Sequence, residues 1–90
     1  MPTLQIRQDV VSREIDGRIV AFSLETGEYV ALDEIGTEMW RLIADDGRLG
    51  AVRARLLADY NITEEACDEE LGAFVGMLEA RKLISRHDQE

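Results

Sequence analysis

Few residues in this chain are of the types that carry out catalysis. His87 is the single histidine, and it lies in a polar C-terminal stretch where nothing would hold it in the geometry that a general base needs. Cys67 is the single cysteine, and its neighbours Glu65, Asp68 and Glu69 would raise the pKa of a thiol rather than lower it. We therefore interpret Cys67 as a buried structural residue and expect no catalytic site.

The dense run of acids between positions 64 and 70 is a second candidate, because carboxylates can hold a metal ion. The run lacks the glycine-centred loop of a calcium site. Acidic residues at these positions are instead favoured by the positive end of a helix dipole. The glycines also do not have the spacing of a phosphate-binding loop. We expect no metal ion and no cofactor.

Composition and charge narrow the classes of partner. The chain has 90 residues, which is enough for one domain, and 19 acidic against 10 basic residues give a formal charge of −9. Such a charge repels a phosphate backbone, so we expect no nucleic acid partner. No apolar run approaches the ~20 residues of a bilayer span, so we expect no membrane association. The N-terminus does not resemble a signal peptide and one cysteine cannot form an internal disulfide, which favours a cytoplasmic location.

The first third of the chain predicts an antiparallel sheet. Apolar alternations and two turn signals are spaced as in a meander, at residues 4–7, 10–11, 16–17, 18–24, 25–27 and 28–32. Asp16-Gly17 is typical of a type I′ hairpin turn, which needs positive φ at both positions. No strong strand follows the third strand, residues 28–32, so we expect the outer edge of this strand to be uncovered.

From residue 33 the apolar period becomes helical. Asp33 is expected to cap a first helix whose buried stripe is Ile35, Met39, Trp40, Leu42 and Ile43. A second helix is expected over residues 49–60. Thr63 is expected to cap a third helix with the stripe Cys67, Leu71, Phe74 and Leu78. Residues 83–86 are expected to add a short extended segment, and residues 87–90 are expected to be a disordered tail. The result is one α+β domain over residues 1–90, winged-helix-like, with a three-stranded antiparallel sheet followed by three helices.

An uncovered strand edge beside a helix flank is the geometry for strand addition, in which an extended peptide pairs with the edge. Gly72, Val75 and Glu79 lie beside the apolar stripe of the third helix and predict a shallow trough bordered by a carboxylate. Two other hypotheses are a DNA-binding winged helix and a subunit that docks to an enzyme without binding peptide. The DNA hypothesis is disfavoured because residues 61–90 carry eight acids against three bases.

The junction between the third strand and the first helix carries a recognisable pattern. Its matching positions are Gly27, Tyr29, Leu32, Gly36, Met39 and Trp40, and Asp33 stands where asparagine is usual. In this pattern, and in residues that follow through Leu83, the chain resembles the PqqD-like family of peptide recognition elements. The resemblance covers roughly residues 8–86.

The resemblance implies a non-catalytic protein that binds the leader segment of a ribosomally made precursor peptide. The leader would lie as an added strand on the third strand and pack against the third helix. The implied partners are this leader and a separately encoded leader peptidase of a lasso-peptide pathway; the alternative is a peptide chaperone for a radical-SAM enzyme. Residues expected to bind the peptide are Glu28, Tyr29, Val30, Ala31, Leu32, Asp33, Asp68, Leu71, Gly72, Val75 and Glu79.

These residues have distinct expected roles. The backbone of residues 28–32 would set the register, and one or two large apolar leader side chains would be seated near Val30, Leu32, Leu71 and Val75. Asp68 and Glu79 would pair with a basic leader residue. Two substitutions, Val75→Arg and Val30→Pro, are expected to abolish leader binding and leave the helices folded.

Overall fold

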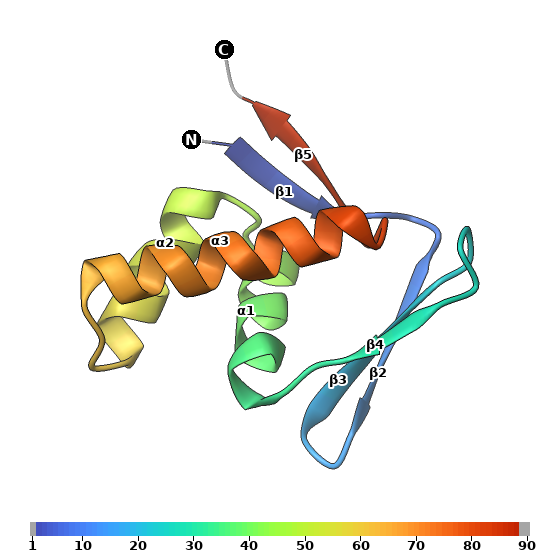
Figure 1. Ribbon diagram of the computed structural model, residues 1–90, viewed down its shortest axis with the longest axis horizontal. Helices are drawn as coiled ribbons and strands as arrows, with labels where there is room; N and C mark the ends of the chain where they lie inside the picture. The colour runs from blue at the N-terminus through green and yellow to red at the C-terminus, as the bar shows by residue number, and fades with distance from the viewer. Residues whose placement is uncertain (1, 89–90) are drawn as a thin grey trace.

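The structure, a computed structural model, describes residues 2–88 and contains five strands and three helices within that range (Figure 1). Their order is β1 (Pro2–Ile6), β2 (Val10–Ile15), β3 (Arg18–Ser23), β4 (Tyr29–Ala31), α1 (Glu34–Asp45), α2 (Leu49–Asp59), α3 (Glu64–Ala80) and β5 (Ile84–Asp88). The predicted α+β class and the order of a three-stranded meander followed by three helices are confirmed.

The meander forms an antiparallel sheet in the order β2-β3-β4, so that β4 is an edge strand. Asp16 and Gly17 both have positive φ, 53° and 80°, as the predicted type I′ turn between β2 and β3 requires. Gly27, with φ of 76°, allows the tight turn into β4. The third strand is shorter than predicted, three residues against five.

A second sheet joins the two ends of the described chain, where β1 pairs antiparallel with β5 (Figure 1). Leu4 also donates its N–H to the Gly47 carbonyl, at 2.6 Å, after α1. Both segments were predicted to be extended, but their pairing was not. His87 and Asp88 belong to β5, so the prediction of a disordered tail is wrong for these two residues, because β1 supplies the pairing partner. Residues 89 and 90 lie outside the described part.

The helices begin where the capping residues predict. The Asp33 carboxylate accepts a hydrogen bond from the Gly36 N–H at 2.7 Å, and the Thr63 hydroxyl oxygen accepts one from the Ala66 N–H at 3.0 Å. Side chains from the helices, β1, β3 and the strand ends form one core, whose buried apolar members are Leu4, Ile19, Ala21, Leu32, Met39, Trp40, Leu42, Ile43, Val52, Leu56, Cys67, Leu71, Phe74, Val75, Leu78, Leu83 and Ile84.

Two residues of α1 depart from the predicted helical stripe. Ile35 is 41% exposed, because the first turn of α1 borders a surface hollow and not the core. Thr37 is buried, and its hydroxyl oxygen accepts a hydrogen bond from the Ile19 N–H at 2.9 Å. This bond fixes β3, and through β3 the edge strand β4, relative to α1.

Candidate functional site

The free edge of β4 presents the main-chain groups of Tyr29 and Ala31. The Leu32 N–H donates to Ile19 and the Glu28 carbonyl accepts from Ser23, both at 2.9 Å. Main-chain groups of an antiparallel strand point alternately to either side, and the register pairs Val30 with Ala21. Glu28, Val30 and Leu32 therefore bond inward to β3, whereas Tyr29 and Ala31 direct their N–H and C=O groups away from the sheet.

The side chains of β4 alternate between the two faces of the sheet. Leu32 is buried and Val30 is half-buried, and both lie on the face that packs on the helices. Tyr29 is 65% exposed on the outer face. This exposure favours a side chain that is open to a partner over one that packs within the sheet.

A hollow of about 230 Å³ lies just beyond the C-terminal end of β4, between the first turn of α1 and one flank of α3. Its lining residues are Asp33, Ile35, Gly36, Met39, Glu70, Ala73, Phe74 and Met77. We call this the α1–α3 hollow. Its wall is mainly apolar, and the described chain gives Glu70 no ion-pair partner. The hollow could therefore seat an apolar side chain beside a carboxylate.

Gly36 permits the close approach of α1 and α3 at this hollow. A Cβ on Gly36 would lie 3.2 Å from the ring of Phe74 and 3.1 Å from the capping oxygen of Asp33. A side chain there would thus press against both the cap of α1 and the wall of the hollow. Sequence reasoning identified Gly36 by its place in the family pattern but did not predict the hollow that it borders.

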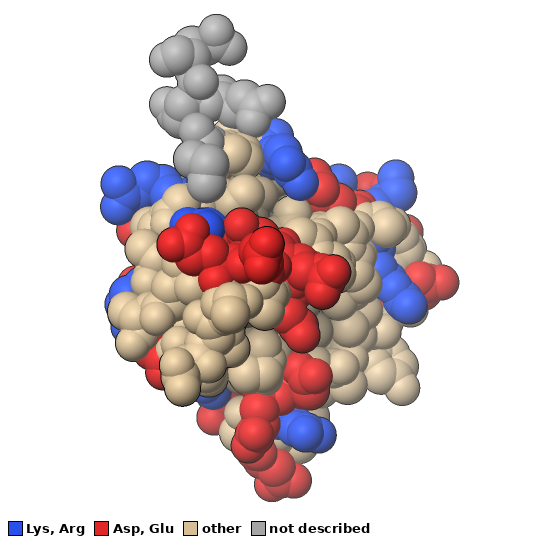
Figure 2. Space-filling view, turned by 60° about the vertical axis from the view of Figure 1, so that its left-hand side comes forward, with Lys and Arg blue, Asp and Glu red and all other residues tan. Residues whose placement is uncertain are grey.

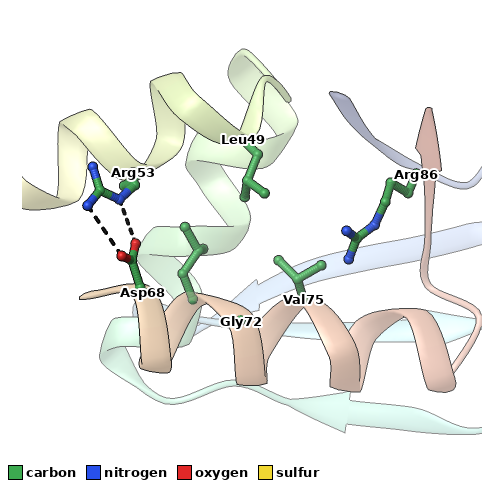
Figure 3. Close-up of a pocket in the computed structure, with 7 residues that line it drawn as sticks. Leu49, Arg53, Asp68, Gly72, Val75 and Arg86 are labelled. Atoms are coloured by element: carbon green, nitrogen blue, oxygen red, sulfur yellow. Dashed lines mark hydrogen bonds and ion pairs between the residues drawn. The ribbon is translucent and has the colours of Figure 1, made fainter. Parts of the chain in front are cut away.

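The opposite flank of α3 lines a different and larger pocket, of about 380 Å³, between α2, α3 and β5 (Figure 3). We call this the α2–α3 pocket; its lining residues are Leu49, Arg53, Asp68, Leu71, Gly72, Val75 and Arg86. Arg53 donates to both Asp68 and Glu64 and lowers the pKa of the Asp68 carboxyl. The trough predicted beside Gly72 and Val75 therefore exists.

The eleven predicted peptide-binding residues do not lie together. Residues 28–33 form the β4 edge and the approach to α1. Asp68, Gly72 and Val75 lie on the far side of α3, and Figure 3 shows β4 below α3 and the α2–α3 pocket above it. Glu79 is on that far flank as well, where it accepts hydrogen bonds from Arg86.

The structure therefore places Asp68, Gly72, Val75 and Glu79 away from the third strand, contrary to their expected position beside it. The positions on α3 were assigned from the helical period, which shows where the apolar stripe is but not which of its two flanks faces the sheet. The residues of α3 that face β4 and α1, including Glu70, Ala73 and Met77, were missed. Leu71 belongs to the core and lines the α2–α3 pocket.

Charge and burial around α3 agree with two interpretations made from the sequence. Figure 2, which brings the end of the molecule at the α2–α3 connection forward, shows acidic side chains gathered on that face. Asp68, Glu69 and Glu70 of α3 are exposed. Cys67 is 1% exposed, and burial together with Asp68 raises the pKa of its thiol, as expected of a structural cysteine. None of the helices within residues 2–88 has the length and apolar character needed to cross a bilayer.

Comparison with known proteins places this geometry in a family. Residues 18–84 match the family described as coenzyme PQQ synthesis protein D (PqqD). The chain belongs to the PqqD family. The match spans β3, β4, the three helices and the first residue of β5, and so includes the free edge of β4 and both flanks of α3.

Two solved structures resemble this PqqD-family chain. One is TbiB1 in complex with the TbiA(beta) leader peptide, 27% identical, with a TM-score of 0.86 over 94% of this chain and 99% of that one. The other is lasso peptide synthetase B1 complexed with the leader peptide, with a TM-score of 0.80 over 92% of this chain and 98% of that one. At 18% identity, the second shows the fold alone. A search of curated proteins gave no match.

Proposed function

We propose that this protein binds the leader segment of a ribosomally made precursor peptide as an additional strand on β4. The observation that carries the proposal is the free edge of β4, with the main-chain groups of Tyr29 and Ala31 directed outward beside an apolar hollow. Membership of the PqqD family and the similarity to TbiB1, which is solved with a leader peptide, support it. We propose a lasso-peptide pathway, and the alternative is a peptide chaperone for a radical-SAM enzyme.

Two kinds of contact would recognise the leader: main-chain hydrogen bonds along β4 and one apolar leader side chain bound in the α1–α3 hollow. An added strand exchanges hydrogen bonds with Tyr29 and Ala31, which fixes its register without reading its sequence. Side chains of the added strand alternate between the two faces of the sheet, so every second one points toward the helices. Where the leader passes the end of β4, an apolar side chain enters the α1–α3 hollow, and Asp33 and Glu70 lie at its rim. These two replace Asp68 and Glu79 as candidate partners of a basic leader residue.

The protein acts without catalysing a reaction, by presenting the bound precursor to a leader peptidase. Holding the substrate on a docked partner raises its effective concentration at the peptidase and fixes its orientation. Because the precursor is made by ribosomes, this role places the protein in the cytoplasm.

The outer face of the β2-β3-β4 sheet is the surface that we assign to the peptidase. Val11, Phe22 and Tyr29 form one cross-strand row on it and are 50%, 36% and 65% exposed, and Leu24 is 62% exposed. Exposed apolar residues gathered on one face are typical of a protein interface. A leader strand added to β4 extends the same face, so a peptidase docked there would contact both the protein and its substrate.

Replacement of Phe22 by Asp tests this assignment. Phe22→Asp places a charge in the middle of the apolar face and leaves the β4 edge intact, so leader affinity stays unchanged while peptidase-dependent leader cleavage falls by about tenfold or more. The measurement is the initial rate of cleavage with purified peptidase at saturating leader. Ile62→Asp is the matched control, since Ile62 is 42% exposed but lies between α2 and α3. Equal losses in both variants would contradict the assignment.

Titration with the leader peptide tests the binding proposal itself. A synthetic leader peptide taken from a neighbouring small open reading frame is the ligand, and a scrambled peptide of the same composition is the control. We expect saturable binding, with amide chemical shift changes at residues 28–33, 34–39 and 70–77. Shift changes confined to residues lining the α2–α3 pocket would contradict strand addition on β4. The absence of binding, with a stable complex to a larger enzyme, would support the docking-subunit alternative.

A further inference from the structure

A network of ion pairs ties the C-terminal end of α3 to the turn that leads into β4. The Lys82 Nζ lies 3.2 Å from one carboxylate oxygen of Glu25, and the Arg7 Nη2 lies 2.7 Å from the other. Beside them, the Arg81 Nη1 lies 3.9 Å from a carboxylate oxygen of Glu28, the residue before β4. All of these groups are at least partly exposed, so each pair alone contributes little to stability.

Lys82 has a backbone conformation that lysine rarely adopts. Its φ is +61°, in the left-handed region. The residue ends α3 in a Schellman motif, in which the Lys82 N–H donates to the Glu79 carbonyl at 3.1 Å and the Leu83 N–H donates to Leu78 at 2.9 Å. Glycine is the usual residue at this position because it takes positive φ without strain. Lysine is therefore the less stable choice for ending the helix.

We propose that Lys82 is a positioning residue for leader binding, and that its side chain latches α3 to the β3–β4 turn. This proposal rests on the proposed function, because the positioning is for leader binding. It explains why a strained lysine is found where glycine would usually end the helix. The latch residues are Arg7, Glu25, Glu28, Arg81 and Lys82.

The latch is important because the added strand must fit between β4 and α3, which requires a fixed distance between these two elements. A strand pairs with β4 at about 4.8 Å, and its inward side chains must fit against α3. Arg81 and Lys82 hold α3 near the first residues of β4, whereas the hydrogen bond between Thr37 and Ile19 holds α1 against β3. Without the latch, the free protein would populate arrangements with other distances between α3 and β4. The apparent affinity for the leader would then fall in proportion to the fraction of molecules that have the binding-competent distance.

Substitution of Lys82 by glycine distinguishes the effect of backbone strain on stability from the effect of the Lys82 side chain on leader binding. Lys82→Gly removes the strained side chain and the ion pair with Glu25 together. We expect the melting temperature to rise by about 2–6 °C. Leader affinity should instead fall by about three- to tenfold. A residue with a merely structural role would move both quantities in the same direction.

Two further variants serve as matched controls. Lys82→Arg keeps the charge and should retain the affinity of the original protein. Asp16→Gly relaxes the other non-glycine residue with positive φ within residues 2–88, in the β2–β3 turn. It should also raise the melting temperature, but with no change in affinity. A Lys82→Gly variant that binds the leader as well as the original protein would overturn the proposal.

A measurement on the free protein keeps this test independent of the proposed function. Relaxation dispersion of the amides at residues 24–28 and 80–83 should increase in Lys82→Gly and stay unchanged in Asp16→Gly. If the original protein binds no leader but dispersion increases, the proposed function fails and the latch stands. If dispersion in Lys82→Gly stays at the original level, the latch is refuted whether or not the leader binds.

Discussion

Ala31→Pro is expected to abolish leader binding while the fold stays intact. The Ala31 N–H points off the free edge of β4, so a proline there removes a donor that only the added strand uses. The leader carbonyl that would accept this bond is left without a partner and the proline ring occupies its place. The loss is about 2–4 kcal/mol, or roughly 30- to 1000-fold in Kd. Isothermal titration calorimetry with the leader measures it, and the melting temperature reports the fold.

Ser12→Pro is the matched control on the opposite edge of the same sheet. Leu24 donates to the Asp9 carbonyl, and the register pairs Ser12 with Ala21, so the Ser12 N–H points away from β3. A proline at this position should leave leader affinity unchanged. Equal losses from Ala31→Pro and Ser12→Pro would show that damage to the sheet, and not strand addition at β4, lowers the affinity.

The structure also corrects one of the substitutions suggested by the sequence. Val30 directs its main-chain groups inward to β3, so Val30→Pro would break the sheet itself rather than the bonds to the leader. The proline substitution that tests strand addition is therefore at Ala31, one residue after Val30.

Ala73→Trp is expected to weaken leader binding by about 10- to 100-fold. Ala73 is exposed on the flank of α3 that lines the α1–α3 hollow. A tryptophan there fills the space in which we expect an apolar leader side chain, whose burial contributes about 1.5–3 kcal/mol. The large side chain adds no charge, so a change in affinity is not an electrostatic effect. Competition binding with a fluorescent leader peptide measures the change.

Gly72→Trp is the control at the neighbouring position. Gly72 lines the α2–α3 pocket on the opposite flank, and a Cβ there meets no atom within 4 Å. We expect this variant to bind the leader normally. If Gly72→Trp loses binding and Ala73→Trp keeps it, the leader uses the α2–α3 pocket and the proposed site is wrong.

The substitution Val75→Arg, which the sequence suggested, cannot test which flank of α3 binds the leader. Val75 is 2% exposed and belongs to the core. An arginine there would bury an unpaired charge and destabilise the whole domain. A loss of leader binding in Val75→Arg would therefore not report on the peptide site.

The sequence by itself determined the features that depend on neighbouring residues. The Asp16-Gly17 turn, the caps at Asp33 and Thr63 and the apolar stripe of α3 depend on conformational preferences and side-chain bonds within a few residues. They were enough to predict the class of fold, the open edge of the third strand and, with the family pattern, the kind of partner.

Only the tertiary structure decided which residues meet across the molecule. The pairing of β1 with β5 joins segments at opposite ends of the chain, and no local pattern encodes it. The helical period places Ala73 and Val75 on opposite sides of one apolar stripe, but the packing of α3 against α2 and β5 decides that Val75 faces away from β4. The flank that forms the site is thus set by how the helices pack on the sheet, which is a property of the assembled core and not of any one segment.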